Sequence, residues 1–158
     1  MVHNRDIAIR LGNTLDVAAI CAFGETHIRP HYEPLIGSVA ACKQVSDWWS
    51  HNVIVRAVGE RAIIIAESGD RLVGVTQVSV QSDPPTIYKL YVHPSWRGRG
   101  VASAMIRYAM EKHRDTRANR FFLTAQSDKL ELYRPFGFLA FGEEFFDAGM
   151  PHRAMRNY

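Results

Sequence analysis

The chain has 158 residues, of which 47% are hydrophobic and 22% charged, and its formal net charge is +3. This length suits one hydrophobic core, so we expect a single domain over residues 1–158. The small positive charge is far below that of nucleic-acid-binding surfaces, and no nucleic-acid partner is expected. No apolar run is long enough for a signal peptide or a membrane span, which predicts a cytoplasmic protein without a membrane partner. Cys21 and Cys42 show no CxxC spacing and are expected to be buried free thiols in helices.

The first predicted elements are a strand, a helix and an irregular segment. Apolar and polar residues alternate over residues 6–11, which indicates a half-exposed strand. Asn13 or Thr14 caps the helix that follows. Residues 25–37 contain two prolines and no clean period, so we expect an ordered loop or a broken helix there.

A second helix and a β-hairpin come next. Ser38 caps the helix, which continues or restarts through residues 53–58. Strands are predicted at residues 62–67 and 72–80, and the turn residues between them, 68–70, are of the types that a hairpin favours.

Residues 86–113 form the stretch around which the chain is organised. Residues 87–92 are bulky on both pleat faces, as in a central strand covered on both sides, and Pro94 ends this strand. A helix begins near Gly100, where apolar residues recur at helical spacing. The strand, the loop and the helix predict a βα unit.

The loop of this unit has the composition of an anion site. Gly98 and Gly100 allow positive φ and a close approach of a ligand to the backbone. The first amides of the next helix lack intrahelical partners, and the helix dipole favours an anion there. Arg97 and Arg99 add donors suited to phosphate. The loop therefore predicts a phosphate-bearing ligand.

The order of residues in the loop is more specific. Arg97-x-x-Gly100-x-Ala102, after a strand that ends in Val-x-Pro, resembles the Gln/Arg-x-x-Gly-x-Gly/Ala signature of the GNAT family of acyl-CoA N-acyltransferases. The resemblance implies that the loop amides cradle the pyrophosphate of coenzyme A and that the strand edge pairs with the pantetheine arm. The cofactor-binding residues that it implies are Leu90, Tyr91, Val92, Arg97, Gly98, Arg99, Gly100, Val101, Ala102, Gln126 and Tyr133. The alternative is a glycine-rich turn that opens an ordinary βα unit.

The last third of the chain completes the fold prediction. Residues 111–120 carry the basic residues Lys112, Arg114, Arg117 and Arg120 and are better explained as a solvated helix end than as a nucleic-acid patch. Strands are expected at residues 121–125, 138–146 and 153–158, with a short helix from Gln126 to Tyr133. The element order resembles the GNAT fold: an α/β (α+β) protein with a mixed central sheet, splayed at the cofactor site and flanked by about four helices.

Two further segments resemble the family. Tyr133-x-x-x-Gly137-Phe138 is similar to its helix-then-Gly-Phe segment, which implies that Tyr133 is the general acid that protonates the departing CoA thiolate. Tyr133 as a core aromatic is the alternative. Gln126 takes the place of a frequent asparagine and implies an amide contact to the pantetheine arm. The ending from Gly149 to Met155 resembles that of a subset of small bacterial GNAT proteins, the ElaA type among them, and would bring His152 towards the acceptor.

The reaction that the resemblance implies is transfer of an acetyl group from acetyl-CoA to a small amine or a protein amine, by direct attack in a ternary complex and without a metal. The acceptor amine must be neutral, and the backbone N–H of Val92 would bind the thioester carbonyl. The central strand has no carboxylate that could act as the base. The candidates are Glu25, His27, His31, Glu33 and His152, with Glu33 as the carboxylate candidate, and a water-mediated route is equally compatible. The residues expected to bind the acceptor are Glu25, His31, Tyr32 and His152.

Three other functions are compatible with parts of the sequence. A metal site at His27, His31 and Glu33 is disfavoured because Pro30 would interrupt a helix that holds both histidines. A catalytically silent acyl-CoA sensor would keep the cofactor loop without acceptor chemistry. An interaction module would use a partner surface, or a homodimer contact, made by Trp48, Trp49, Phe145 and Phe146.

Overall fold

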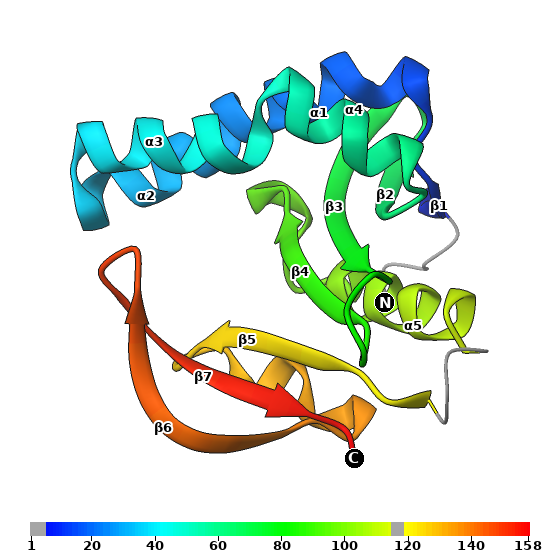
Figure 1. Ribbon diagram of the computed structural model, residues 1–158. Helices are drawn as coiled ribbons and strands as arrows, with labels where there is room; N and C mark the ends of the chain where they lie inside the picture. The colour runs from blue at the N-terminus through cyan, green and yellow to red at the C-terminus, as the bar shows by residue number, and fades with distance from the viewer. Residues whose placement is uncertain (1–5, 115–118) are drawn as a thin grey trace.

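The computed structural model describes residues 6–114 and 119–158, and within them seven strands form one mixed sheet (Figure 1). The strand order is β1-β2-β3-β4-β5-β7-β6, and of these neighbouring pairs only β4 and β5 are parallel. The strands are β1 (Ala8–Leu11), β2 (Ile63–Ser68), β3 (Arg71–Ser79), β4 (Thr86–Val92), β5 (Phe122–Gln126), β6 (Leu139–Asp147) and β7 (Met150–Arg156). This sheet confirms the predicted α/β (α+β) class with a mixed central sheet.

Helices cover both faces of the sheet (Figure 1). They are α1 (Val17–Phe23), α2 (Arg29–Ile36), α3 (Ser38–Trp49), α4 (His51–Gly59) and α5 (Val101–Lys112). Helices α1, α3 and α4 bury apolar side chains against Val75 on one face, and α5 buries Val101 and Met105 against Val92 on the other. Short 3₁₀ turns occur at Thr14–Asp16, Pro94–Trp96, Leu130–Leu132 and Arg134–Phe136.

The prediction of a loop at residues 25–37 was wrong, because this segment is helical. A π-helical turn, Gly24–Ile28, joins α1 to α2. Pro30 is the second residue of α2, directly after the π-helical turn, and Ile28 and Arg29 before it have helical φ and ψ angles. Pro30 therefore does not interrupt the helical path between His27 and His31.

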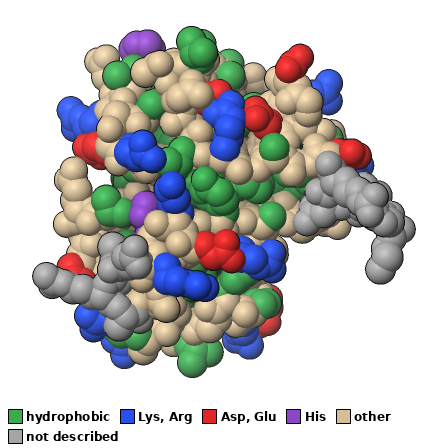
Figure 2. All heavy atoms as spheres, turned by 90° about the vertical axis from the view of Figure 1, so that its right-hand side faces the viewer, with side chains coloured by type: hydrophobic (Ala, Val, Ile, Leu, Met, Phe, Trp, Pro, Cys, Tyr) green, Lys and Arg blue, Asp and Glu red, His purple; other side chains and the backbone are tan. Residues whose placement is uncertain are grey.

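Smaller corrections concern the cysteines and the C-terminal third. Cys42 is exposed and Cys21 only partly buried, so the prediction of buried thiols was wrong. In place of the short helix expected from Gln126 to Tyr133 there is one 3₁₀ turn, Leu130–Leu132, and a second one follows at Arg134–Phe136. The last strand begins at Met150. Arg117, part of the basic segment, lies outside the described residues. On the face seen in Figure 2, basic and acidic side chains are interspersed.

The predicted splay between β4 and β5 is present. The two strands pair only at Thr86 with Phe122 and at Ile87 with Leu123, although both strands continue. On its other edge β4 carries a bulge, since its register with β3 shifts between Val75 and Gln77. The second half of β4 thus presents a free backbone edge towards β5.

No helix in the described part of the chain combines the length and the apolar character needed to cross a bilayer.

Candidate functional site

The loop before α5 has an open backbone surface. Gly98 and Gly100 have φ of +72° and +78°, a conformation that side-chain-bearing residues rarely adopt. A β-carbon at either position would meet no atom within 4 Å, so the space above the loop is free. No side chain caps α5, and the first amides of a helix lack intrahelical acceptors. The loop therefore offers backbone donors and open space to an anion.

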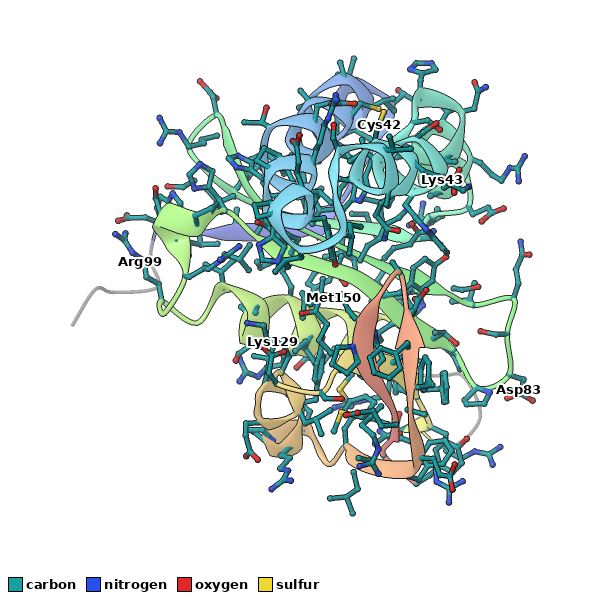
Figure 3. The ribbon with its side chains drawn as sticks, turned by 90° about the vertical axis from the view of Figure 1, so that its left-hand side faces the viewer. Cys42, Lys43, Asp83, Arg99, Lys129 and Met150 are labelled. Carbon is teal, nitrogen blue, oxygen red and sulfur yellow. The ribbon has the colours of Figure 1, made fainter. Side chains whose placement is uncertain are left out.

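Two arginines of the loop lie against aromatic rings. The Arg97 guanidinium lies 5.0 Å from the centroid of the Tyr91 ring, and its Nε donates a hydrogen bond of 3.2 Å to the Val92 carbonyl. The Arg99 guanidinium lies 4.9 Å from the Trp96 ring centroid. Both arginines are exposed, and Arg99 projects from the edge of the molecule in Figure 3. The loop therefore adds two cations to its backbone donors.

The backbone of Val92 faces the open edge of β4. The N–H of His93 donates to the Val73 carbonyl of β3 at 2.8 Å. Because consecutive N–H groups of a strand point to opposite edges, the Val92 N–H points towards β5, where β4 has no pairing partner. This is the edge that the sequence assigns to the pantetheine arm.

Tyr133 lies beside the same face of the sheet as α5. It ends the 3₁₀ turn Leu130–Leu132, and its ring centroid is 6.2 Å from that of the buried Phe138. Burial raises the pKa of the Tyr133 hydroxyl to about 12, so the group is protonated at neutral pH. The geometry is compatible with both a proton donor and a packing residue.

Gln126 links the C-terminal end of β5 to α2. Its Nε2 donates to the Tyr32 hydroxyl at 3.3 Å, which joins the end of β5 to α2. Its register partner in β7 is His152, whose Nδ1 lies 2.8 Å from the Met150 carbonyl and whose ring stacks on Phe145 at 5.9 Å. A cavity of about 550 Å³ lies on the outer side of α2 and α3 and does not reach Gln126. A second cavity, of about 410 Å³, adjoins Gln126. The second cavity is lined by Gln126, Ser127, Asp128, Met150 and Pro151.

The structure brings two of the predicted histidines to the end of β4. The His31 ring lies 5.7 Å from the Tyr91 ring, and the His27 ring lies 4.4 Å from that of His93, centroid to centroid. The Tyr91 hydroxyl donates to the His27 carbonyl at 3.2 Å. Burial is the main cause that lowers the pKa of both His27 and His31. His93 and Arg97 lower the pKa of His27 further, and Arg97 and Lys129 lower that of His31 against the opposing charge of Asp128. Both rings are therefore neutral at pH 7 and can accept a proton.

The predicted carboxylates have a different setting. Glu25 and Glu33 are exposed, and Glu25 forms an ion pair of 3.4 Å with Arg29. The role of Glu33 as a base stays a prediction. Within residues 6–114 and 119–158, no group of three or more His, Cys, Asp or Glu residues is arranged to hold a metal ion.

Sequence reasoning missed a polar network around Lys89. Its Nζ donates to Gln77 Oε1 at 2.7 Å, and Gln77 Nε2 donates to the Tyr88 hydroxyl at 2.8 Å. The ammonium lies 5.8 Å, 5.7 Å and 6.0 Å from the ring centroids of Trp48, Trp49 and Tyr88. The signal in the sequence was a lysine within an otherwise apolar strand.

The two tryptophans differ in exposure. Trp49 is a core residue with 4% of its surface exposed, whereas Trp48 is 45% exposed. Trp49 therefore does not belong to a partner surface, which corrects that part of the interaction-module hypothesis. Phe145 and Phe146 are exposed, as that hypothesis requires.

Comparison with known proteins identifies the family of this chain. A family model described as "Acetyltransferase (GNAT) domain" matches residues 39–158. N-acetyltransferase 8F1 of Rattus norvegicus is 31% identical over 90 residues, which make up 51% of this chain and 41% of that protein. The match thus spans less than half the length of this relative.

Solved structures share the fold. The PaiA N-acetyltransferase of Thermoplasma acidophilum, solved in complex with coenzyme A, is similar with a TM-score of 0.77 and 14% identity, over 95% of this chain and 97% of its own. Escherichia coli ElaA is similar with a TM-score of 0.55 and 24% identity, over 61% of this chain and 67% of its own. At these identities the likeness concerns the arrangement of strands and helices.

Proposed function

This chain belongs to the GNAT family of acetyltransferases, and on that premise we propose that it transfers an acetyl group from acetyl-CoA to a primary amine, by direct attack in a ternary complex. The observation that carries the proposal is the open glycine loop at the N-terminus of α5, which adjoins the unpaired edge of β4.

The residues of the loop and the strand edge fit coenzyme A. Backbone amides of residues 98–102 would hold the pyrophosphate, with Arg97 and Arg99 as counter-charges. The edge of residues 90–92 would pair with the amides of the pantetheine arm as a neighbouring strand does, and Arg97 would release the Val92 carbonyl for this purpose. The PaiA structure, which contains coenzyme A, supports this fit at the level of the fold.

Residues of this chain can meet each requirement of the transfer. Acetyl-CoA supplies an activated acyl group as a thioester. The N–H of Val92 would donate to the carbonyl oxygen as negative charge develops there, and Tyr133 would give its proton to the thiolate. His31 or His27, both neutral at pH 7, would take the proton of the amine, directly or through water, and Glu33 is the carboxylate alternative.

The acceptor would bind on the α2 side of the splayed strands. Tyr32 and His31 of α2 and His152 of β7 surround this side, and the β6–β7 hairpin that carries Met150 lies beneath α2 and α3 (Figure 3). The acceptor is a small amine or a protein amine. The alternative function is a silent acyl-CoA sensor. Such a sensor would bind acetyl-CoA with the same loop but would not acetylate any acceptor.

Calorimetric titration with acetyl-CoA and with free CoA, followed by thiol-release assays with a panel of amines, tests the proposal. We expect dissociation constants in the micromolar range and thiol release that depends on the amine. Binding without release for any amine would favour the sensor. Absence of binding would overturn the cofactor assignment, and the glycine loop would then be a structural turn.

A further inference from the structure

Lys89 is a partly buried cation held by uncharged groups. Its only hydrogen-bond acceptor within the described residues is Gln77 Oε1, and the ring centroids of Trp48, Trp49 and Tyr88 lie 5.7 to 6.0 Å from the ammonium. Across residues 6–114 and 119–158 it forms no ion pair. A buried charge without a counter-ion is costly, and such groups usually have a partner.

The bulge in β4 determines where this ammonium points. Lys89 has φ of +57°, and both Lys89 and Tyr88 contact Trp48 of α3. The ammonium therefore lies on the α1–α4 face of the sheet, opposite to α5. Tyr91 follows two positions after Lys89 in β4, and its ring lies on the same face of the sheet, against Phe23 and His31. An anion bound to Nζ would thus lie on the face of β4 that carries Tyr91 and His31, the side proposed to bind the acceptor.

Basic residues lie near this edge, and two of them, His27 and His31, are neutral at pH 7. His27, His31 and His93 cluster at the end of β4, and Arg97 lowers the pKa of the first two. Lys129 also acts on His31. The acids whose charge reaches these groups are Asp128, beside His31, and Asp147, which acts on Tyr32. The charges of Arg97 and Lys129 are matched by those of Asp128 and Asp147, so Lys89 is the cation that a negatively charged group on the acceptor would neutralise.

We propose that the acceptor carries a carboxylate next to its amine, as a free α-amino acid does, and that Lys89 binds this carboxylate. The inference rests on the proposed acetyl transfer and names the class of its acceptor. An α-amino acid has one carbon between the two groups, so a carboxylate on Nζ would keep the amine on the face of the sheet that carries Tyr91 and His31.

The protonation of Lys89 agrees with this role. Burial lowers the pKa of its ammonium to about 8, as expected for a cation that lacks an anion. A bound carboxylate would raise this pKa again, because it favours the charged form.

Thiol release with matched acceptors provides the test. The panel consists of free amino acids and of the corresponding amino acid amides, which retain the amine but lack the carboxylate. We expect kcat/KM to be about 10- to 100-fold higher for the acids, the range of a hydrogen bond between charged groups. Lys89→Met should abolish this preference and leave turnover of the amides and the affinity for acetyl-CoA within about threefold of the wild type.

Lys43→Met is the matched control. Lys43 is an exposed lysine of α3 that pairs with Asp47 at 2.6 Å. Replacing Lys43 by methionine removes one positive charge, as Lys89→Met does, but at a position outside β4. The preference for acids should persist in this variant. Equal turnover of acids and amides by the wild type, or an unchanged preference in Lys89→Met, would overturn the assignment. Turnover of peptide N-termini in place of free acids would also overturn it.

A binding measurement separates this inference from the proposed transfer. With CoA present, N-acetyl amino acids should raise the Tm of the wild type more than their amides do, and Lys89→Met should remove the difference. If CoA binds but no amine is turned over, the transfer proposal fails, and this difference in Tm still decides whether Lys89 binds a carboxylate. No difference in the wild type would overturn the role of Lys89.

Discussion

Gly100→Glu should abolish tight binding of CoA. The φ of Gly100 is +78°, and a side chain there would project into the open space that the pyrophosphate is proposed to occupy. A carboxylate about 5 Å from a phosphate charge would cost about 1 to 3 kcal/mol for each charge pair, for effective dielectric constants between 20 and 80. The dissociation constant for CoA should therefore rise by at least about 5- to 150-fold. Calorimetric titration measures it directly.

The backbone cost of the same change can be controlled. Gly69 lies in the β2–β3 turn at φ of +57°, and a β-carbon there would also meet no atom within 4 Å. Gly69→Glu therefore introduces the same charge and a similar backbone strain away from the loop. It should lower Tm about as much as Gly100→Glu and leave CoA binding unchanged. Wild-type affinity in Gly100→Glu, or equal loss in both variants, would refute the assignment of the loop.

Three further predictions concern the acid, the histidines and a helix crossing. Tyr133→Phe should lower kcat about 100-fold and change the Kd for acetyl-CoA by less than about threefold. The reason is that the hydroxyl, whose pKa is raised to about 12, is proposed to give its proton to the thiolate. Steady-state kinetics measure kcat, and calorimetry measures the Kd. The free energy of unfolding should fall as the pH falls below about 6.5. Because the pKa values of His27 and His31 are lowered in the folded protein, the unfolded chain binds more protons than the folded chain below this pH. Urea titrations at several pH values measure the free energy of unfolding. Gly24→Ala should destabilise the protein by about 1 to 3 kcal/mol, since its β-carbon would lie 2.6 Å from that of Trp49; thermal unfolding measures this.

Each of these predictions has a contradicting outcome. An equal loss of turnover and of acetyl-CoA binding in Tyr133→Phe would make Tyr133 a packing residue. A pH dependence that survives replacement of His27 and His31 by glutamine would have another origin. Gly59→Ala, in α4 and with no atom within 4 Å of the added carbon, is the control for Gly24→Ala and should change stability little.

The glycine loop at residues 97–102 could be predicted from the sequence as a turn between a strand and a helix, because the signals for it are local. Residues 97–102 are consecutive, and the strand before them and the helix after them are visible as periodic patterns. The π-helical turn before α2 had no such signal. Prolines at 30 and 34 reduce helix propensity, yet packing of Phe23 and Ile28 in the core keeps the segment helical.

The network around Lys89 could not be predicted in this way, because its partners come from other elements. Gln77 lies in β3, and Trp48 and Trp49 lie in α3. Their meeting depends on the register of β3 with β4 and on the bulge that shifts it. A single sequence shows the lysine in the strand, but neither the register nor the helix above it.

The bulge in β4 links the two parts of the proposed site. A non-glycine residue at φ of +57° costs about 1 to 2 kcal/mol, so the conformation of Lys89 must be compensated by contacts around it. The hydrogen bond to Gln77 and the three aromatic rings supply those contacts. Strand β4 turns Lys89 towards α3. The following residues of β4 do not pair with β5, which exposes the Val92 N–H. One short strand can therefore hold the acyl donor by its backbone and select the acceptor by a side chain.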